Sequence, residues 1–228
     1  MNTPRLRSEL ALGRQKLRRI LTETSPRILK AGEMIRTSEA RVDGIYYLRT
    51  GWACRVREFP NGRRAILDVY LPGDVIGLDA FLRTRSLEEV LTLTSVTVQA
   101  SHAENALLDS SIALYLGWLL GQHQRRADRV LTAVLGLDAR GRMATMILDF
   151  YTRLQRRKLI TGLTYNLPLT QCQIGQYLGL TVVHINRTLR SLRAQALIYL
   201  EKNCVTILDL DRLTDLARGG DMTTASAA

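Results

Sequence analysis

The spacing of hydrophobic residues changes along this chain, and each change marks a different kind of element. Leucines recur at helical spacing near the start and predict a helix over residues 5–21. From residue 27 the spacing becomes alternate, in short runs that are separated by Gly and Pro turns. Asn61-Gly62 between two such runs predicts a β-hairpin, and residues 91–100 form another alternating run. Many short strands of this kind are typical of a small barrel or jelly roll.

After residue 103 the spacing becomes helical again. Residues recur every four and then every three positions, as in the seam of a coiled coil, and a second stripe lies beside the first. Two stripes indicate a helix that contacts both its own barrel and a second copy of the chain. We assign the first stripe to the dimerisation seam, and its polar members His123 and Arg126 are expected to set the register or to respond to a signal. The first stripe comprises Ile112, Leu116, Leu119, His123, Arg126, Val130, Ala133 and Leu137, and the second comprises Leu120, Ala127, Leu131 and Val134.

Residues 167–200 predict two short helices that are joined by a tight turn. Thr170 is a good N-cap, and Gln173 three residues later completes a capping box. Gly179 is expected to end this helix, since glycine readily takes the positive φ of a C-cap. Thr181 is a second N-cap, and the next helix is predicted over residues 182–195.

The second helix of this pair has two different faces when its residues are counted at 100° each. Arginines and small apolar groups on the outer face of a helix that is held by a partner helix suit the major groove of DNA. The alternative is an ordinary amphipathic helix whose basic face is solvated. The predicted inner face carries Ile185, Leu189, Leu192 and Ala196, and the outer face carries Val183, Arg187, Arg190 and Ala194, flanked by His184 and Asn186.

Two β-type runs, residues 197–201 and 204–208, predict a hairpin around Lys202-Asn203 behind the helix pair. With this hairpin the segment resembles the DNA-binding end of the CRP/FNR family, the bacterial cyclic-AMP receptor and fumarate-nitrate regulators. The earlier order of Gly51, a hairpin, Pro72-Gly73-Asp74 and Ile76-Gly77 is similar to the sensor domain of that family. The helix-turn-helix pattern of the family is met by Thr170, Ile174, Leu178, Gly179, Thr181, Ile185, Arg187, Leu189 and Leu192.

The resemblance implies an α+β protein of three parts. They are an N-terminal jelly-roll or double-stranded β-helix domain of the cyclic-nucleotide-binding type, a long dimerisation helix and a C-terminal winged helix-turn-helix. The expected divisions are an N-terminal helix at 1–24, a sensor β-barrel at 25–103, a dimerisation helix at 104–137, a DNA-binding domain at 138–218 and a disordered tail at 219–228.

The charge of the chain indicates that it binds nucleic acid, and its cysteine content indicates that it is located inside the cell. The net charge is +11 and the pI is near 10.1, which favours a polyanion, DNA before an anionic membrane. Residues 140–200 hold nine Arg or Lys, at 140, 142, 153, 156, 157, 158, 187, 190 and 193, against Asp149 alone. Three scattered cysteines form neither a disulfide framework nor a zinc spacing. The start has no secretory signal, and residues 112–120 are too short to cross a bilayer, so a cytoplasmic location is expected.

The sensor domain matches the family's cyclic-AMP pocket poorly. The resemblance implies a Gly-Glu pair for the ribose and an Arg-Ser/Thr pair for the phosphate. Gly77 is present, but Leu78 follows it and Asp79 lies one place late. Arg85-Ser86 comes just before two carboxylates, which would repel a phosphate. Cyclic nucleotide is therefore disfavoured, and another small-molecule effector stays open.

No cofactor is predicted for this domain. An iron-sulfur cluster normally needs four thiolates, and the chain has three cysteines. Haem stays open, because one axial ligand is enough, and the candidates are His102, His123 and Cys54. Cys54 is otherwise a small buried residue. Cys172, at a predicted helix start, is a candidate for regulatory oxidation.

The function implied is a homodimeric DNA-binding transcription regulator that reads an inverted repeat and, by family resemblance, contacts RNA polymerase. Arg187 is expected to contact guanine, and Val182 and Val183 to touch thymine methyl groups. Thr170, Gln171, Thr181 and Arg190 are expected to contact phosphates, and His184 and Asn186 a phosphate or a base edge. The alternative is an effector-binding module whose helix-turn-helix contacts protein. An enzyme is disfavoured, because three dispersed histidines and no nucleophile motif do not form a catalytic centre.

Overall fold

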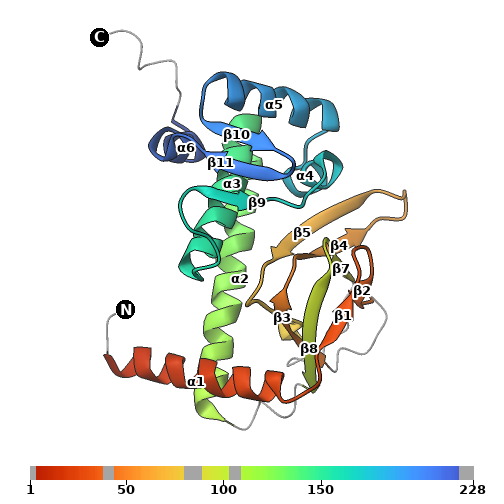
Figure 1. The fold of residues 1–228 in the computed structure, drawn as a ribbon, viewed down its shortest axis with the longest axis vertical. Helices are drawn as coiled ribbons and strands as arrows, with labels where there is room; N and C mark the ends of the chain where they lie inside the picture. The colour runs from red at the N-terminus through yellow and green to blue at the C-terminus, as the bar shows by residue number, and fades with distance from the viewer. Residues whose placement is uncertain (1–3, 38–43, 80–88, 103–108, 221–228) are drawn as a thin grey trace. The chain divides into compact units, whose positions relative to one another are not determined.

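The computed structural model describes residues 4–37, 44–79, 89–102 and 109–220. The chain divides into two compact units, Met1–Arg126 and Ala127–Ala228, and the boundary falls within one long helix, α2. The elements of each unit are labelled in Figure 1.

The first unit contains two four-stranded antiparallel sheets, with strand orders β1-β8-β3-β6 and β2-β7-β4-β5. Both sheets contribute to one apolar core, which includes Leu48 and Val98 from the first sheet and Ala53 and Val90 from the second. The expected jelly-roll class of fold is confirmed. The strands are β1 (Arg27–Leu29), β2 (Met34–Arg36), β3 (Gly44–Thr50), β4 (Ala53–Glu58), β5 (Arg64–Tyr70), β6 (Val75–Ile76), β7 (Glu89–Thr92) and β8 (Val96–His102).

The hairpin predicted at Asn61-Gly62 joins β4 and β5. Gly62 has a φ of 74°, and the Asn61 side chain accepts a hydrogen bond from the backbone N–H of Arg63 at 3.1 Å. The alternating run at residues 91–100 is not one strand, however. It divides into β7 and β8, which belong to different sheets, because the backbone turns after Thr92 and the N–H of Leu93 bonds to the carbonyl of Trp52 at 2.8 Å.

The N-terminal helix is confirmed as α1 (Pro4–Thr22), and it packs on the start of α2 (Ser110–Gly136) (Figure 1). Lys16 forms an ion pair with Asp109 at 2.5 Å, and Asp109 also caps the first turn of α2 by accepting from the N–H of Ser111. The inner leucines of α1 belong to a second apolar cluster, which comprises Leu17, Leu21, Ile45, Val75, Leu78, Ile112 and Leu116.

The first stripe of α2 differs from the expectation that it forms a seam with a second chain. Ile112 and Leu116 are buried in the core of their own unit, and Leu119 packs against it. His123 and Arg126 both contact Asp68 of β5. Helical spacing identifies a stripe but does not say which neighbour covers it, and here the chain's own first unit covers the members from Ile112 to Arg126. The second stripe is exposed at Leu120 and Leu131, by 43% and 57%, and three apolar residues on neither stripe, Leu114, Trp118 and Leu135, are exposed as well.

The second unit is a helical domain with a three-stranded sheet of order β10-β11-β9. The hairpin predicted around Lys202-Asn203 joins β10 and β11, and these two residues have φ angles of 47° and 66°. The strand β9 and the last helix α6 were not predicted individually. The elements are α3 (Ala139–Arg156), β9 (Thr164–Asn166), α4 (Gln171–Leu178), α5 (Val182–Ala194), β10 (Ile198–Glu201), β11 (Cys204–Ile207) and α6 (Leu210–Ala217).

Candidate nucleic-acid interface

The two predicted helices and their turn are present as α4 and α5. The Thr170 hydroxyl accepts a hydrogen bond from the N–H of Gln173 at 3.2 Å, and the Gln173 side chain accepts from the N–H of Thr170 at 2.8 Å. This is the predicted capping box. Gly179 ends α4 with a φ of 67°, and the Thr181 hydroxyl then caps α5 by accepting from the N–H of His184 at 3.3 Å. Short-range chemistry therefore determines where each helix begins and ends.

A residue that the sequence pattern did not single out brings the two helices together. Gly175 lies in the middle of α4, and a Cβ at this position would be 2.5 Å from the carbonyl oxygen of Leu180. The N–H of Leu180 also bonds to the carbonyl of Gly175 at 3.0 Å. The turn can close this tightly only because residue 175 has no side chain. A glycine inside a short helix, four residues before the C-cap glycine, was the signal available in the sequence.

The inner face of α5 is largely as predicted. Ile185, Leu189 and Leu192 are buried, together with Thr188. Ala196 is a correction, because it is exposed and has a φ of 53°. The helix ends at Ala194 and Gln195 is its C-cap, so helical periodicity does not extend to residue 196.

The predicted reading residues are all exposed; seven lie at the N-cap of α5 or along it, and two lie at the start of α4. Val182 and Val183 are 42% and 67% exposed, so two adjacent branched apolar side chains lie at the surface where α5 begins. The two residues at the start of α4 are Thr170 and Gln171, and both helices are labelled in Figure 1. The exposed set comprises Thr170, Gln171, Thr181, Val182, Val183, His184, Asn186, Arg187 and Arg190.

Three of the nine basic residues counted toward this interface are engaged within their own unit. Arg142 donates hydrogen bonds to the backbone carbonyls of Leu137 and Leu178, at 3.0 and 3.3 Å. Arg140 pairs with Asp138 at 3.2 Å. Arg153 pairs with Asp149 at 3.3 Å. The excess of charge predicted from the sequence is therefore smaller at the surface, where the exposed bases are Arg156, Lys158, Arg187, Arg190 and Arg193.

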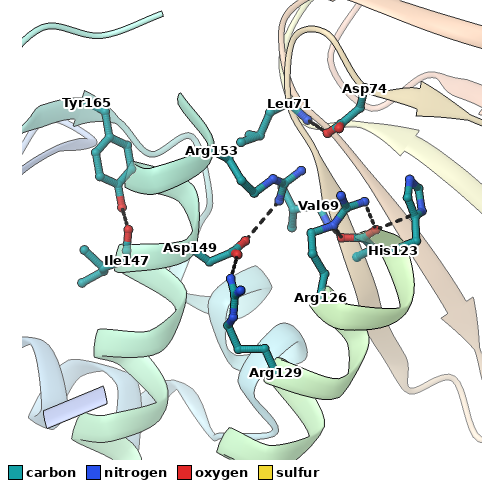
Figure 2. A network of polar contacts seen from close by, with 11 residues as sticks. Val69, Leu71, Asp74, His123, Arg126, Arg129, Ile147, Asp149, Arg153 and Tyr165 are labelled. Carbon is teal, nitrogen blue, oxygen red and sulfur yellow. Dashed lines mark hydrogen bonds and ion pairs between the residues drawn. The ribbon is translucent and has the colours of Figure 1, made fainter. Parts of the chain in front are cut away.

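Asp149, the one acid in that count, is buried and neutralised. Figure 2 shows its carboxylate between Arg129, from the last part of α2, and Arg153, one turn further along α3. Nearby, the Tyr165 hydroxyl donates to the carbonyl of Ile147 at 2.9 Å, so β9 is tied to the middle of α3. These contacts hold the scaffold on which α4 and α5 rest, and they leave no exposed carboxylate from this residue to oppose a polyanion.

Of the sensor-domain residues that resemble an effector pocket, the structure describes Gly77, Leu78 and Asp79. Gly77 has a φ of 83°, and a Cβ there would lie 2.7 Å from the carbonyl oxygen of Gly44. Leu78 is buried in the core cluster of α1 and α2. Asp79 pairs with Arg36 of β2 through two hydrogen bonds of 2.7 and 2.5 Å. Arg85 and Ser86 lie outside the described residues.

The polar residues in the middle of α2 face the barrel of their own unit (Figure 2). Arg126 donates to the Asp68 carboxylate at 2.9 Å, and Nδ1 of His123 lies 3.8 Å from the same carboxylate. Burial, followed by the charge of Arg126, lowers the pKa of His123 to about 4, against the opposing effect of Asp68. His123 is therefore neutral at physiological pH.

The remaining candidate ligands lie apart. Cys54 is buried in β4, and burial raises its pKa to about 12 in spite of the nearby charge of Arg64, so its thiol stays protonated. Cys172 and Cys204 are exposed. The side chain of His102 lies outside the described part of the chain. Within the described residues, no group of three His, Cys, Asp or Glu is placed to hold a metal ion.

Each of the two units contains a region that matches a known domain family. The cyclic nucleotide-binding domain family matches residues 26–105, and the Crp-like helix-turn-helix domain family matches residues 141–216. The transcriptional activator FnrL of Cereibacter sphaeroides is 25% identical over 212 residues, which cover 84% of this chain and 79% of FnrL. The nitrogen fixation regulation protein FixK of Rhizobium meliloti is 26% identical over 180 residues, which cover 78% and 81% of the two chains.

Solved structures share the fold. FixK2 from Bradyrhizobium japonicum superposes with a TM-score of 0.75 at 24% identity, over 90% of this chain and 98% of FixK2. A CRP-family regulator from Thermus thermophilus gives a TM-score of 0.68 at 21% identity, over 84% and 96% of the two chains. None of the helices in the described ranges combines the length and the apolar character that a bilayer span requires. With both of these domains present in this order, and with regulators as its relatives, the chain belongs to the CRP/FNR family of transcription regulators.

Proposed function

We propose that two copies of this chain form a dimer that reads an inverted repeat in duplex DNA, with one α5 helix in each of two successive major grooves. The single observation that carries this proposal is the outer face of α5. It exposes Arg187, Arg190 and Val183 while Ile185, Leu189 and Leu192 hold the opposite face in the core. A helix that is anchored in this way can enter a groove without giving up its own packing.

The residues on this face suit different contacts. Arg187 lies in the middle of α5, where a guanidinium can donate two hydrogen bonds to one guanine. Val182 and Val183 in the first turn can contact only apolar groups, such as thymine methyls. His184 and Asn186 can reach a phosphate or a base edge. Thr170, Gln171, Thr181 and Arg190 lie where they can bind phosphates and so orient the helix.

The dimer is proposed to form through the second stripe of α2. Exposed or half-exposed residues recur there every four and then every three positions, which is the spacing of a coiled-coil seam. Three of the residues at this spacing are small, Ala113, Gly117 and Ala127, so two helices can approach closely there. The proposed seam comprises the second stripe, Leu120, Ala127, Leu131 and Val134, together with Ala113, Gly117 and Gln124, which continue its spacing. The first stripe, including Val130 and Ala133, would then serve the chain's own units.

Cyclic AMP is not part of this proposal. Leu78 stands where the family's ribose carboxylate is expected, and it packs in the core. Asp79 already binds Arg36. We propose no cofactor, and we assign any effector to another chemical class. A cytoplasmic location and a contact with RNA polymerase complete the proposal, in line with relatives that are named as activators.

The experiment that tests the proposal is selection of bound duplexes from a random pool by the purified full-length protein, with and without cell extract. The expected result is an inverted repeat whose half-sites lie about one helical turn apart, or about 10 base pairs. Enrichment of single half-sites would contradict the dimer. Failure to bind any duplex at low salt, in either condition, would contradict DNA reading and would favour the alternative that α4 and α5 contact another protein.

A further inference from the structure

Strand β2 carries an arginine whose charged group lies inside the barrel wall. The side chain of Arg36 is 7% exposed. Its two terminal nitrogens donate to the two carboxylate oxygens of Asp79, from Nη1 to Oδ1 at 2.7 Å and from Nη2 to Oδ2 at 2.5 Å. Its Nε is also buried and has no hydrogen-bond partner among the described residues. In the part of the chain that the structure describes, Asp79 is the one anion that pairs with this buried guanidinium.

A second arginine on the same face of the sheet increases the need of Arg36 for a neutralising anion. Arg36 pairs with Val90 of β7, Val90 pairs with Arg55 of β4, and Arg55 pairs with Asp68 of β5. Directly paired residues share one face of a sheet, so Arg36 and Arg55 lie on the same face with a single valine between them. The carboxylate at the end of this row, Asp68, is already paired with Arg126, so the two arginines still favour a further anion. Both arginines help to lower the pKa of Asp79, and Arg36 does so more strongly, although burial acts in the opposite direction.

A rigid turn presents the carboxylate. Residue 77 must be glycine, because its φ is 83° and the Gly44 carbonyl occupies the space of a side chain. Leu78 then points into the core, where it packs with Leu17 and Ile45. Asp79 follows directly and extends to Arg36, while 38% of its side chain stays exposed. The carboxylate is therefore held at the edge of the barrel rather than enclosed within it.

We propose that the Arg36 guanidinium is the core of a carboxylate-binding site, and that the chain fills this site with its own Asp79. The planar guanidinium and a carboxylate form two parallel hydrogen bonds, which a rounder anion such as chloride cannot form. The tethered carboxylate acts as an internal ligand, so the barrel reaches its folded arrangement without a separate anion. This inference concerns the sensor barrel alone and does not depend on how α5 reads DNA.

The test uses the full-length protein and the variant Asp79→Ala. The substitution removes one carboxylate and leaves the Cβ, so the missing group has the size of formate. The melting temperature is expected to fall by roughly 5 °C or more, because a buried cation loses its partner. Sodium formate is expected to restore it along a saturable curve, whereas sodium chloride at the same ionic strength is not. The wild-type protein is expected to show no saturable response to formate.

Two further variants make the result specific. Glu58→Ala removes a carboxylate from the exposed pair with Arg64, at 3.1 Å on the neighbouring strands, and should show no response to formate. Arg36→Met combined with Asp79→Ala removes the cation, and the formate response should disappear. If Asp79→Ala does not fold in chloride, the yield on refolding in formate against chloride gives the same comparison. An Asp79→Ala protein that formate restores no better than chloride would overturn the proposal and leave a purely structural ion pair.

Discussion

The guanidinium of Arg142, at the start of α3, donates a hydrogen bond to the backbone carbonyl of Leu178, the last residue of α4, at 3.3 Å. The same side chain donates to the carbonyl of Leu137 at 3.0 Å. One residue thus satisfies two carbonyls, one just before α3 and one just before the turn that leads to α5. Because Gly179 follows Leu178 directly, this contact helps to set the direction in which α5 leaves the turn.

Replacing Arg142 by Met should therefore weaken DNA binding although the residue faces inward. Two charge-assisted hydrogen bonds, each worth about 1.5 kcal/mol or more, would no longer hold the turn. We expect fewer molecules to present α5 correctly, and the affinity to fall about tenfold. Fluorescence anisotropy with a selected duplex measures this. Arg156→Met removes the same charge from an exposed position of α3 and serves as the control. If the two variants weaken binding equally, Arg142 acts only through its charge.

Arg187 and Arg190 should differ in what they contribute. Arg187→Ala is expected to lose roughly 1–3 kcal/mol of discrimination at one base position, because the proposed contact reads guanine. Arg190→Ala is expected to weaken binding to all sequences alike and to lower the salt slope of the affinity by about 1. Titrations of matched and mismatched duplexes at several salt concentrations separate these effects. Equal behaviour of the two variants would refute the roles assigned to them.

Gly175→Ala should destabilise the second unit. The new Cβ would lie 2.5 Å from the carbonyl oxygen of Leu180, so the turn between α4 and α5 would have to open. We expect a loss of about 1–3 kcal/mol in the free energy of unfolding, which urea denaturation measures. Gly136→Ala places a Cβ in open space. It should change the free energy of unfolding by only about a few tenths of the loss expected for Gly175→Ala. Comparable losses in both variants would mean that the close approach at residue 175 is not limiting.

The two stripes of α2 should respond to substitution in opposite ways. Leu120→Glu, on the proposed seam, is expected to convert the dimer to monomer in analytical ultracentrifugation with little change in monomer stability. Ile112→Ala, in the core, is expected to cost about 2–5 kcal/mol of unfolding free energy and to keep the dimer at temperatures where the chain is folded. Leu114→Glu, also exposed but off the seam, is the control for added charge. A Leu120→Glu protein that remains dimeric would place the interface elsewhere.

His123 should make the protein less stable in mild acid. Its pKa is lowered to about 4 in the folded chain, whereas histidine in an unfolded chain titrates near 6.5. Between these values the unfolded chain binds more protons, so stability falls as the pH drops from about 6.5 to about 4. The groups around it are Asp68, Asp74, Arg55 and Arg126. Thermal melts across this range should show the loss, and His123→Gln should flatten it; an unchanged profile in the variant would assign the loss to other groups.

The capping residues in the sequence correctly predicted the helix-turn-helix formed by α4 and α5. Thr170 with Gln173, Gly179 and Thr181 each act within a few residues, so the ends of α4 and α5 followed from capping preferences alone. The inner face of α5 followed from periodicity up to the point where the helix ends. Ala196 lies just beyond the C-cap Gln195, in the turn that ends the helix, where its N–H bonds to the carbonyl of Arg193 and the next N–H bonds to the carbonyl of Leu192; such a turn takes a positive φ.

Long-range placement was predicted less well. The assignment of the first α2 stripe to a dimer seam was made from spacing, yet Ile112 and Leu116 face their own barrel. The charge count treated Arg142 and Arg153 as surface charges. In the structure Arg142 binds the carbonyl of Leu178, and Arg153 binds the carboxylate of Asp149. The pairing of Arg36 with Asp79 joins residues 43 positions apart. Each case depends on which segments meet in the folded chain, and spacing along one segment carries no information on this.

The close crossing of α1 over α2 has a consequence for truncated versions of the sensor. Gly13 lies so near the Ser111 carbonyl that no side chain fits between the two helices, and four residues further on Leu17 closes over Ile112. A fragment that began at residue 26, where the domain match begins, would leave that cluster open to water. The smallest sensor fragment that can fold by itself is therefore expected to include α1. This helix covers the core of the first unit as the strands do.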